Sequence, residues 1–232
     1  MRRIVLLAAL GSWFVASPAG AQPSPVVVEL FTSQGCSSCP PADMFLTELA
    51  HSGRNLLPLA FHVTYWDRLG WRDPFSLEAA TMRQRDYART LGDGGVYTPE
   101  MVVGGVQGFV GSEREAGLAA IARASERASA PDTVPVRLSR RGDELMVSVG
   151  AGRDRAAILL VGYDPEHRTA VGRGENGGRT LLESNIVRSL TPLGSWSGET
   201  VQLASAAPAG ERFAVLLQAA DGRILAVGTL AK

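Results

Sequence analysis

Cys36 and Cys39 are the residues of this chain best suited to chemistry, and they are its only cysteines. They lie in the stretch ELFTSQGCSSCPPAD (residues 29–43), between an apolar run and a segment with helical spacing of apolar residues. A pair of cysteines separated by two residues can form a redox-active disulfide, supply half of a metal site, or make a small structural bridge.

Thiol–disulfide exchange is the interpretation that these residues favour. A structural bridge across so short a loop stabilises a fold by only ~2 kcal/mol before strain is subtracted. A closed zinc site needs four ligands, and the three histidines His51, His62 and His167 do not stand at paired ligand spacings. Copper(I) accepts two thiolates and stays open as an alternative. In the exchange reaction, Cys36 is expected to be the exposed nucleophile and Cys39 the resolving thiol, with no metal and no organic cofactor.

The neighbouring elements determine how reactive the pair is. VVVELF (residues 26–31) predicts a strand buried on both faces, and apolar positions in residues 42–49 predict a helix. The first turn of a helix has unpaired N–H groups and a positive dipole end, which favour a thiolate. Pro40 and Pro41 delay the start of this helix, which weakens that effect on Cys36.

Further elements extend this strand and helix into a small α/β fold. The sequence predicts a second buried strand at residues 56–63 and a helix that starts at Asp73-Pro74 and ends at Gly92. A hairpin around Gly104-Gly105 and a last helix to about Arg127 follow. This order predicts a mixed sheet with helices on both faces.

A polar, proline-bearing stretch predicts a domain boundary near Ala130. Beyond it, short β-like runs alternate with turn signals, which predicts a β-rich, sandwich-like domain over residues 131–232. The α/β domain is accordingly expected over residues 22–130.

The N-terminal residues are typical of a secretory signal peptide. Arg2 and Arg3 precede the apolar run IVLLAALGSWFVA, and the small residues AGA predict cleavage after Ala21. The run is short for a membrane anchor, and no later segment is apolar enough to span a membrane. A periplasmic or secreted protein is therefore expected, in a compartment that permits disulfides. The formal net charge is zero and no basic run occurs, so nucleic acid is not an expected partner. No stretch indicates a subunit interface.

The strand, the cysteine pair, the alternating helices and strands and YTPEMVVGG (residues 97–105) resemble the thioredoxin fold. Within that superfamily, the chain is most similar to a family of exported bacterial proteins known only as a domain of unknown function. This closer resemblance rests on four stretches, VVVELFTSQGCSSCPPAD, FHVTYWDRLGWRDPF, VYTPEMVVGG and GENGGRTLLESNIVR. It implies a thioredoxin-like domain followed by a β domain.

The resemblance also implies roles for residues outside the cysteine pair. Thr98-Pro99 matches a peptide bond that is cis in thioredoxin-like proteins, where it lies against the dithiol and binds substrate backbone. Glu29 matches the strand that carries a buried acid, a possible proton acceptor for the resolving cysteine if its pKa is raised by burial. The alternative for Glu29 is an edge position facing water. Gly35 departs from the pattern of thioredoxins, which usually have tryptophan there.

Two other stretches allow two interpretations each. The aromatic residues of FHVTYWDRLGWRDPF (residues 61–75) can form a wall beside the site, although packing under a loop is favoured. GENGGR (residues 174–179) can form an anion-binding nest, although a hairpin turn is favoured.

The sequence as a whole predicts an exported protein that exchanges disulfides with a protein or a small-molecule thiol. The alternative is a non-catalytic binding protein on a thioredoxin scaffold, either copper(I)-binding or with an inert disulfide.

Overall fold

A computed structural model describes residues 24–92, 94–128 and 133–230. The predicted signal peptide, residues 1–21, and the predicted boundary near Ala130 lie outside the described residues. The elements follow in the order β1 (Val26–Thr32), α1 (Pro40–His51), β2 (Leu56–His62), a 3₁₀ turn (Thr64–Trp66), α2 (Glu78–Leu91), β3 (Glu100–Val103), β4 (Gln107–Val110), α3 (Arg114–Ala128), β5 (Val136–Arg141), β6 (Glu144–Val149), β7 (Ala156–Ala170), β8 (Thr180–Trp196), β9 (Val201–Ala206), β10 (Arg212–Ala219) and β11 (Ile224–Thr229).

Eight strands form one mixed sheet in the order β11-β10-β7-β8-β2-β1-β3-β4. Strand β1 runs parallel to β2 and antiparallel to β3, and β2 pairs in parallel with β8 at Ala60 and Ile186. All other neighbours in this sheet are antiparallel. The predicted mixed sheet is therefore confirmed, and so is the β3–β4 hairpin, whose turn has Gly104 and Gly105 at positive φ.

Helices cover both faces of the sheet around β1. Alternate side chains of a strand point to opposite faces, so Val28 and Leu30 pack in one apolar cluster with side chains of α1 and α3. Val27 and Phe31 pack in a second cluster with side chains of α2. Burial on both faces explains why β1 reads as a nearly continuous apolar run.

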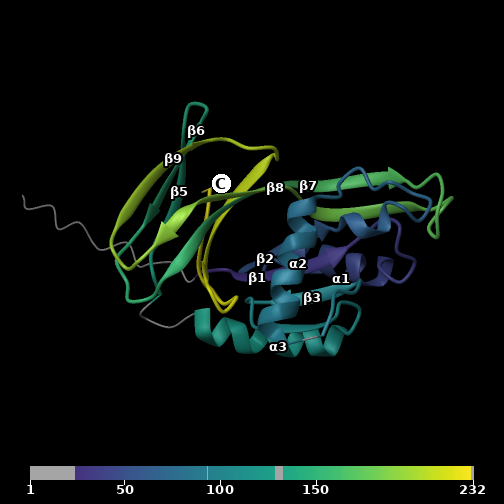
Figure 1. Cartoon of the computed structure of the whole chain (residues 1–232), viewed down its shortest axis with the longest axis horizontal. Coiled ribbons are helices and arrows are strands. Elements are labelled where there is room, and N and C mark those ends of the chain that lie inside the picture. Colours follow the sequence, from purple (N-terminus) through teal and green to yellow (C-terminus); the bar gives the residue numbers. More distant parts are fainter. Residues whose placement is uncertain (1–23, 93, 129–132, 231–232) are drawn as a thin grey trace, which may run out of the picture.

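Strands β5, β6 and β9 form a separate three-stranded antiparallel sheet. A third apolar cluster packs it against β7, β10 and β11. Figure 1 shows this β-rich part at one end of the molecule and the helices at the other, with the long strands β7 and β8 reaching between them. Because β7, β8, β10 and β11 belong to the same sheet as β1 to β4, strand pairing joins residues on both sides of the predicted boundary. In the described part of the chain, none of the helices has the length and apolar character needed to cross a membrane.

Helix α2 begins later than the sequence suggests. The predicted start at Asp73-Pro74 is wrong, because the helix begins at Glu78. The carboxylate of Asp73 instead accepts hydrogen bonds from the backbone N–H groups of Gln34, at 2.8 Å, and Phe75, at 2.9 Å. Asp73 thus ties a turn to the loop after β1 rather than capping a helix. The predicted end is confirmed, since Gly92 closes the helix with a φ of 78°.

Candidate functional site

The disulfide lies at the corner between β1 and α1. Cys36 and Cys39 are bonded, with their Cα atoms 5.5 Å apart, so the predicted pairing is confirmed. The backbone N–H of Cys36 donates to the carbonyl oxygen of Ser33 at 3.1 Å, and that of Cys39 donates to the carbonyl oxygen of Cys36 at 3.2 Å. Cys39 is the N-cap of α1, which begins at Pro40. Two tight turns therefore carry the chain from the sheet into the helix, and the disulfide closes the second of them.

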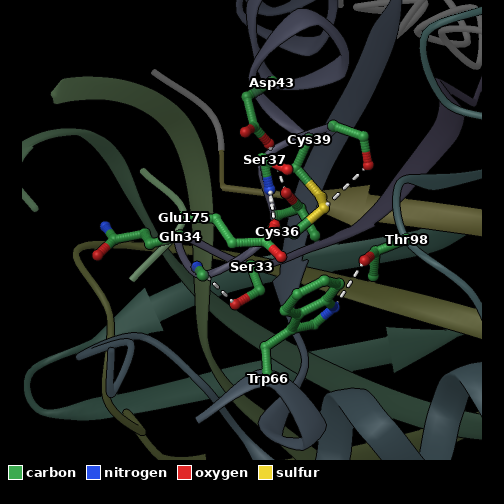
Figure 2. The surroundings of a disulfide bond; sticks show 12 residues. Ser33, Gln34, Cys36, Ser37, Cys39, Asp43, Trp66, Thr98 and Glu175 are labelled. Atoms are coloured by element: carbon green, nitrogen blue, oxygen red, sulfur yellow. Dashed lines mark hydrogen bonds between the residues drawn. A yellow bond between two sulfur atoms is a disulfide. The ribbon is translucent and has the colours of Figure 1, made fainter. Parts of the chain in front are cut away.

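Both cysteines are enclosed in this conformation. Cys36 and Cys39 are each 0% exposed, whereas Ser37 and Ser38 between them are exposed. The prediction of an exposed Cys36 is therefore wrong for the oxidised protein. Neither cysteine belongs to one of the three apolar clusters. Figure 2 shows instead that side chains from several loops gather around the disulfide, among them that of Trp66.

One of these loops is the connection between β7 and β8, which we call the hairpin tip (residues 171–179). The strands on either side pair antiparallel, so the favoured hairpin turn is confirmed. Gly174 has a φ of 77°, and a Cβ at this position would lie 3.1 Å from the Cβ of Trp71. Glycine suits both the positive φ and the close approach. The hairpin tip thus packs directly on the aromatic loop that follows β2.

Two adjacent side chains of the hairpin tip hold the loop that carries the cysteines, which we call the disulfide loop (residues 33–39). Asn176 is 0% exposed, and its side-chain amide donates to the carbonyl oxygens of Gln34 at 3.0 Å and Cys36 at 2.9 Å. The carboxylate of Glu175 accepts a hydrogen bond from the backbone N–H of Ser37 at 3.0 Å. The peptide group between Cys36 and Ser37 is therefore held at both its carbonyl and its N–H. Neither Glu175 nor Asn176 was among the predicted site residues.

Trp66 connects the disulfide loop to Thr98. Its indole Nε1 donates to the hydroxyl oxygen of Thr98 at 2.8 Å. Its Cβ lies 3.4 Å from the place that a Cβ on Gly35 would take, so the tryptophan backs directly onto the loop. The Thr98–Pro99 peptide is cis, as the resemblance implied. The predicted pair Thr98 and Pro99 is thereby tied to the loop that carries the cysteines (Figure 2).

The aromatic loop serves both of the roles considered for it. Trp66 and Trp71 contact the disulfide loop, the second through a hydrogen bond from its Nε1 to the side-chain carbonyl of Gln34 at 3.0 Å. Phe75, by contrast, is 8% exposed and packs in the apolar cluster beneath α1 and α3.

Gln34 links the disulfide loop to a buried polar network. Its side-chain amide donates to the carboxylate of Glu183 at 2.6 Å, and its backbone N–H donates to Asp73. Asp73 in turn pairs with Nδ1 of His62 at 2.7 Å. These four side chains are almost completely buried. The network reaches from the loop into β2 and β8, and none of its acids was among the predicted site residues.

His62 is enclosed by acidic groups. Burial alone would lower the pKa of His62, but the negative charges of Asp73 and Glu183 outweigh burial and raise it to about 9. Burial would likewise raise the pKa of Asp73, yet His62 and several hydrogen bonds hold it below its ordinary value. Burial raises the pKa of Glu183. At neutral pH, His62 therefore carries a positive charge that balances Asp73.

Asp43 is a further buried acid beside the disulfide. It lies one turn after Cys39 in α1 and accepts a hydrogen bond from the hydroxyl of Thr32 at 2.8 Å (Figure 2). Burial, reinforced by the negative charge of Glu183, raises the pKa of Asp43 from 3.8 to about 8. Its carboxyl is therefore protonated at neutral pH on the helix that carries Cys39. The spacing of four residues, which places two side chains on one helix face, was the available sequence signal.

Glu29 is buried, as one of its two interpretations expected, but it is committed to an ion pair. Arg83 of α2 approaches it with two nitrogens, at 2.6 and 3.1 Å. Arg83 also donates to Tyr87 at 2.9 Å. Glu29 is thus paired toward α2, on the opposite face of β1 from α1, and its role as a proton acceptor stays a prediction.

The four stretches that carry the resemblance meet at this site. The first contributes the cysteines, Gln34 and Asp43, and the others contribute the remaining partners, namely His62, Trp66, Trp71, Asp73, Thr98, Glu175, Asn176 and Glu183. Within residues 24–92, 94–128 and 133–230, no group of three or more His, Cys, Asp or Glu side chains is arranged to hold a metal ion.

Comparisons with known proteins relate the chain to one family and to two solved structures. The family described as "Protein of unknown function (DUF1223)" matches residues 27–218. The crystal structure of protein AGR_C_4864 from Agrobacterium tumefaciens is 32% identical, with 89% of this chain and 93% of that chain covered and a TM-score of 0.71. HBP35 of Porphyromonas gingivalis is similar in fold, at 12% identity, 89% and 74% coverage and a TM-score of 0.59. No curated protein matches the chain. The family match and the Agrobacterium relative together establish that the chain belongs to the DUF1223 family.

Proposed function

We propose that this protein is an exported thiol–disulfide oxidoreductase with a thioredoxin-like N-terminal part. It exchanges disulfides with a protein or small-molecule thiol in the periplasm or outside the cell. The observation that carries the proposal is the Cys36–Cys39 disulfide, set between a buried strand and the first turn of a helix and tied through Trp66 to Thr98. The mixed sheet with helices on both faces supports the same assignment.

In the oxidising direction, a client thiolate attacks Sγ of Cys36. A bond forms between the client sulfur and Cys36, the Cys36–Cys39 bond breaks, and Cys39 leaves as a thiolate that takes up a proton. The protonated carboxyl of Asp43, one turn further along α1, is the proposed source of that proton. A second client thiolate then attacks the client sulfur and releases Cys36. Two electrons pass to the protein, and the client gains a disulfide. In the reducing direction, Cys36 attacks a client disulfide and Cys39 resolves the mixed species.

Because both cysteines are buried, the reaction requires the cover to open. The hairpin tip is held on the disulfide loop by the hydrogen bonds of Glu175 and Asn176 and by its packing on Trp71. A hydrogen bond of this kind contributes about 0.5–1.5 kcal/mol net, and exposed loops belong to the parts of a fold that open most readily. A conformation in which the hairpin tip has moved away from the cysteines is therefore accessible by thermal fluctuation.

The burial of both cysteines is also the observation that favours the second candidate, a binding protein on a thioredoxin-like scaffold with an inert disulfide. On that reading the bridge only fixes the corner between β1 and α1. A copper(I)-binding version would need both thiols reduced, so it shares the requirement for opening.

Equilibration with glutathione buffers distinguishes the two. We expect the purified protein to become reduced within the accessible range of these buffers, measured by alkylation and mass spectrometry. We also expect Cys39→Ser, expressed in the native host, to trap a client through a mixed disulfide on Cys36, with the double variant Cys36→Ser/Cys39→Ser as the control that traps nothing. A disulfide that stays oxidised in every buffer, with nothing trapped, establishes the inert bridge instead.

A further inference from the structure

A negative charge lies against the backbone that directly follows Cys36, whose sulfur reduction would free to ionise. The carboxylate of Glu175 accepts the backbone N–H of Ser37, the residue bonded to Cys36. Hydrogen bonding from Ser37, first through its side chain and then through its backbone N–H, lowers the pKa of Glu175, so its carboxylate is charged at neutral pH. A thiolate on Cys36 would be stabilised by nearby N–H donors and destabilised by a nearby anion. The hydroxyl of Ser38, 3.3 Å from Sγ of Cys36, is a donor of the first kind. Glu175 acts in the opposite direction, since it occupies the backbone N–H of Ser37 and supplies an anion beside the same loop.

Asn176 fixes the same peptide group from its other side. Its side-chain nitrogen bonds two backbone carbonyls of the disulfide loop, and its side-chain oxygen accepts a hydrogen bond from Arg179 at 3.1 Å. The amide is therefore oriented by partners at both ends. Because Asn176 is 0% exposed, its removal would leave the carbonyls of Gln34 and Cys36 without this buried donor.

We propose that the hairpin tip holds the cysteine pair in its oxidised form, with Asn176 fixing the Cys36 backbone and Glu175 placing a carboxylate on the adjoining N–H of Ser37. This inference rests on the proposed function and adds its regulation. A partner that draws the hairpin tip away removes the anion, frees the N–H of Ser37 and opens a path to Cys36 in one movement. The disulfide is then inaccessible to thiols that do not displace the hairpin tip, and it becomes reactive when the tip is displaced.

The effect of the Glu175 charge on the equilibrium between the oxidised and the reduced protein can be estimated. Glu175 is exposed, so water and salt screen its charge, and two charges a few ångströms apart at such a site change an equilibrium by on the order of three- to tenfold. Glu175→Gln keeps a hydrogen-bond acceptor for Ser37 and removes only the charge. We therefore expect this variant to shift the equilibrium with glutathione toward the reduced protein by about three- to tenfold. High salt should shrink the shift.

The experiment compares Glu175→Gln and Asn176→Ala with two matched controls. Glu166→Gln removes an exposed carboxylate from β7 of the same hairpin, away from the tip. Asn185→Ala removes a side-chain amide that donates to a backbone carbonyl elsewhere, that of Pro58 at 2.8 Å. Three quantities are measured for each: the equilibrium constant with glutathione, the pKa of the Cys36 thiol from alkylation rates, and the initial rate of reduction by a phosphine.

We expect Glu175→Gln to lower the pKa of the Cys36 thiol and Asn176→Ala to speed reduction at least tenfold, while both controls react as the wild type does. If the wild type exchanges with glutathione and both tip variants match it in all three quantities, the holding role of the tip is refuted and the proposed function stands. If neither the wild type nor the variants can be reduced, both proposals are wrong. Glu175 is exposed, so Glu175→Gln keeps the test decisive even where Asn176→Ala fails to fold.

Discussion

Replacing His62 by glutamine tests whether the buried acids beside the disulfide depend on a protonated imidazole. His62 is 0% exposed and pairs with Asp73 at 2.7 Å. Glutamine keeps polar atoms at this position but carries no charge. Removing one partner of a buried ion pair leaves the other charge without compensation, which typically costs about 3–5 kcal/mol.

The pKa of His62 gives a similar magnitude and also a pH window. Burial opposes the charged imidazole, but Asp73 and Glu183 together raise its pKa from 6.5 to about 9. At 1.36 kcal/mol per unit, this corresponds to on the order of 3 kcal/mol. Because the folded pKa lies above the unfolded value, this stabilisation is fully present below pH 6.5 and is lost as the pH rises through 9.

Urea unfolding of the oxidised protein measures the effect directly. We expect His62→Gln to lower the free energy of unfolding by about 3 kcal/mol near pH 6, and the difference from the wild type to shrink steadily toward about pH 9.5. His51→Gln replaces an exposed imidazole and should leave the free energy of unfolding unchanged at every pH. A difference that stays constant over this range would refute the assignment of a charged His62.

Two further substitutions test Asp43 on α1 and the packing of the hairpin tip on Trp71. Burial raises the pKa of Asp43 to about 8. Between pH 3.8 and about 8, the group is therefore ionised in the unfolded chain but protonated in the folded protein, and the free energy of unfolding falls as the pH rises. Asp43→Asn should remove that slope from urea unfolding, and a slope that persists contradicts the assignment. Gly174→Ala sets a methyl group against Trp71 at positive φ and should cost at least ~1–2 kcal/mol and speed phosphine reduction of the disulfide. The control is Gly142→Ala, which is also at positive φ but has nothing within 4 Å of the added Cβ, so it should lower stability without changing the rate of reduction. Equal reduction rates in the two variants would contradict the packing of the hairpin tip on Trp71 as a barrier to reduction.

Local patterns predicted the elements that present the cysteines. The β-branched run in residues 26–31 is a strand because both its faces are buried, and Gly104-Gly105 does form a hairpin turn. The spacing of Cys36 and Cys39, together with the absence of paired ligand spacings among the histidines, favoured a disulfide over a metal site, and the two residues are bonded. Asp73 was misread for a physical reason, because an aspartate before a proline has the same local signature whether it caps a helix or binds a distant N–H group.

The partners that enclose the disulfide could not be found in this way. Asn176 is 140 residues from Cys36 in the sequence, and Glu183 is 149 residues from Gln34. Periodicity and turn chemistry describe the few residues around each position, so they identified GENGGR as a turn but not the surface on which it packs. The burial of Cys36 was not predicted either, because the hydrogen bonds that hold its backbone come in part from Asn176, far away in the sequence.

The β7–β8 hairpin contacts both the backbone around the disulfide and the buried polar network. Its tip holds the backbone of Cys36 and Ser37, while Glu183, a few residues further along β8, bonds Gln34 and shares the acidic network with His62. Strand β8 is joined to β2 within the sheet, whereas the tip reaches the disulfide loop through side-chain hydrogen bonds. The tip can therefore be released without breaking the sheet that keeps the acids in place. The cysteines come from one side of the predicted boundary and the hairpin tip from the other, so on the proposed function the reactivity of the pair depends on C-terminal residues as well as on the cysteines themselves.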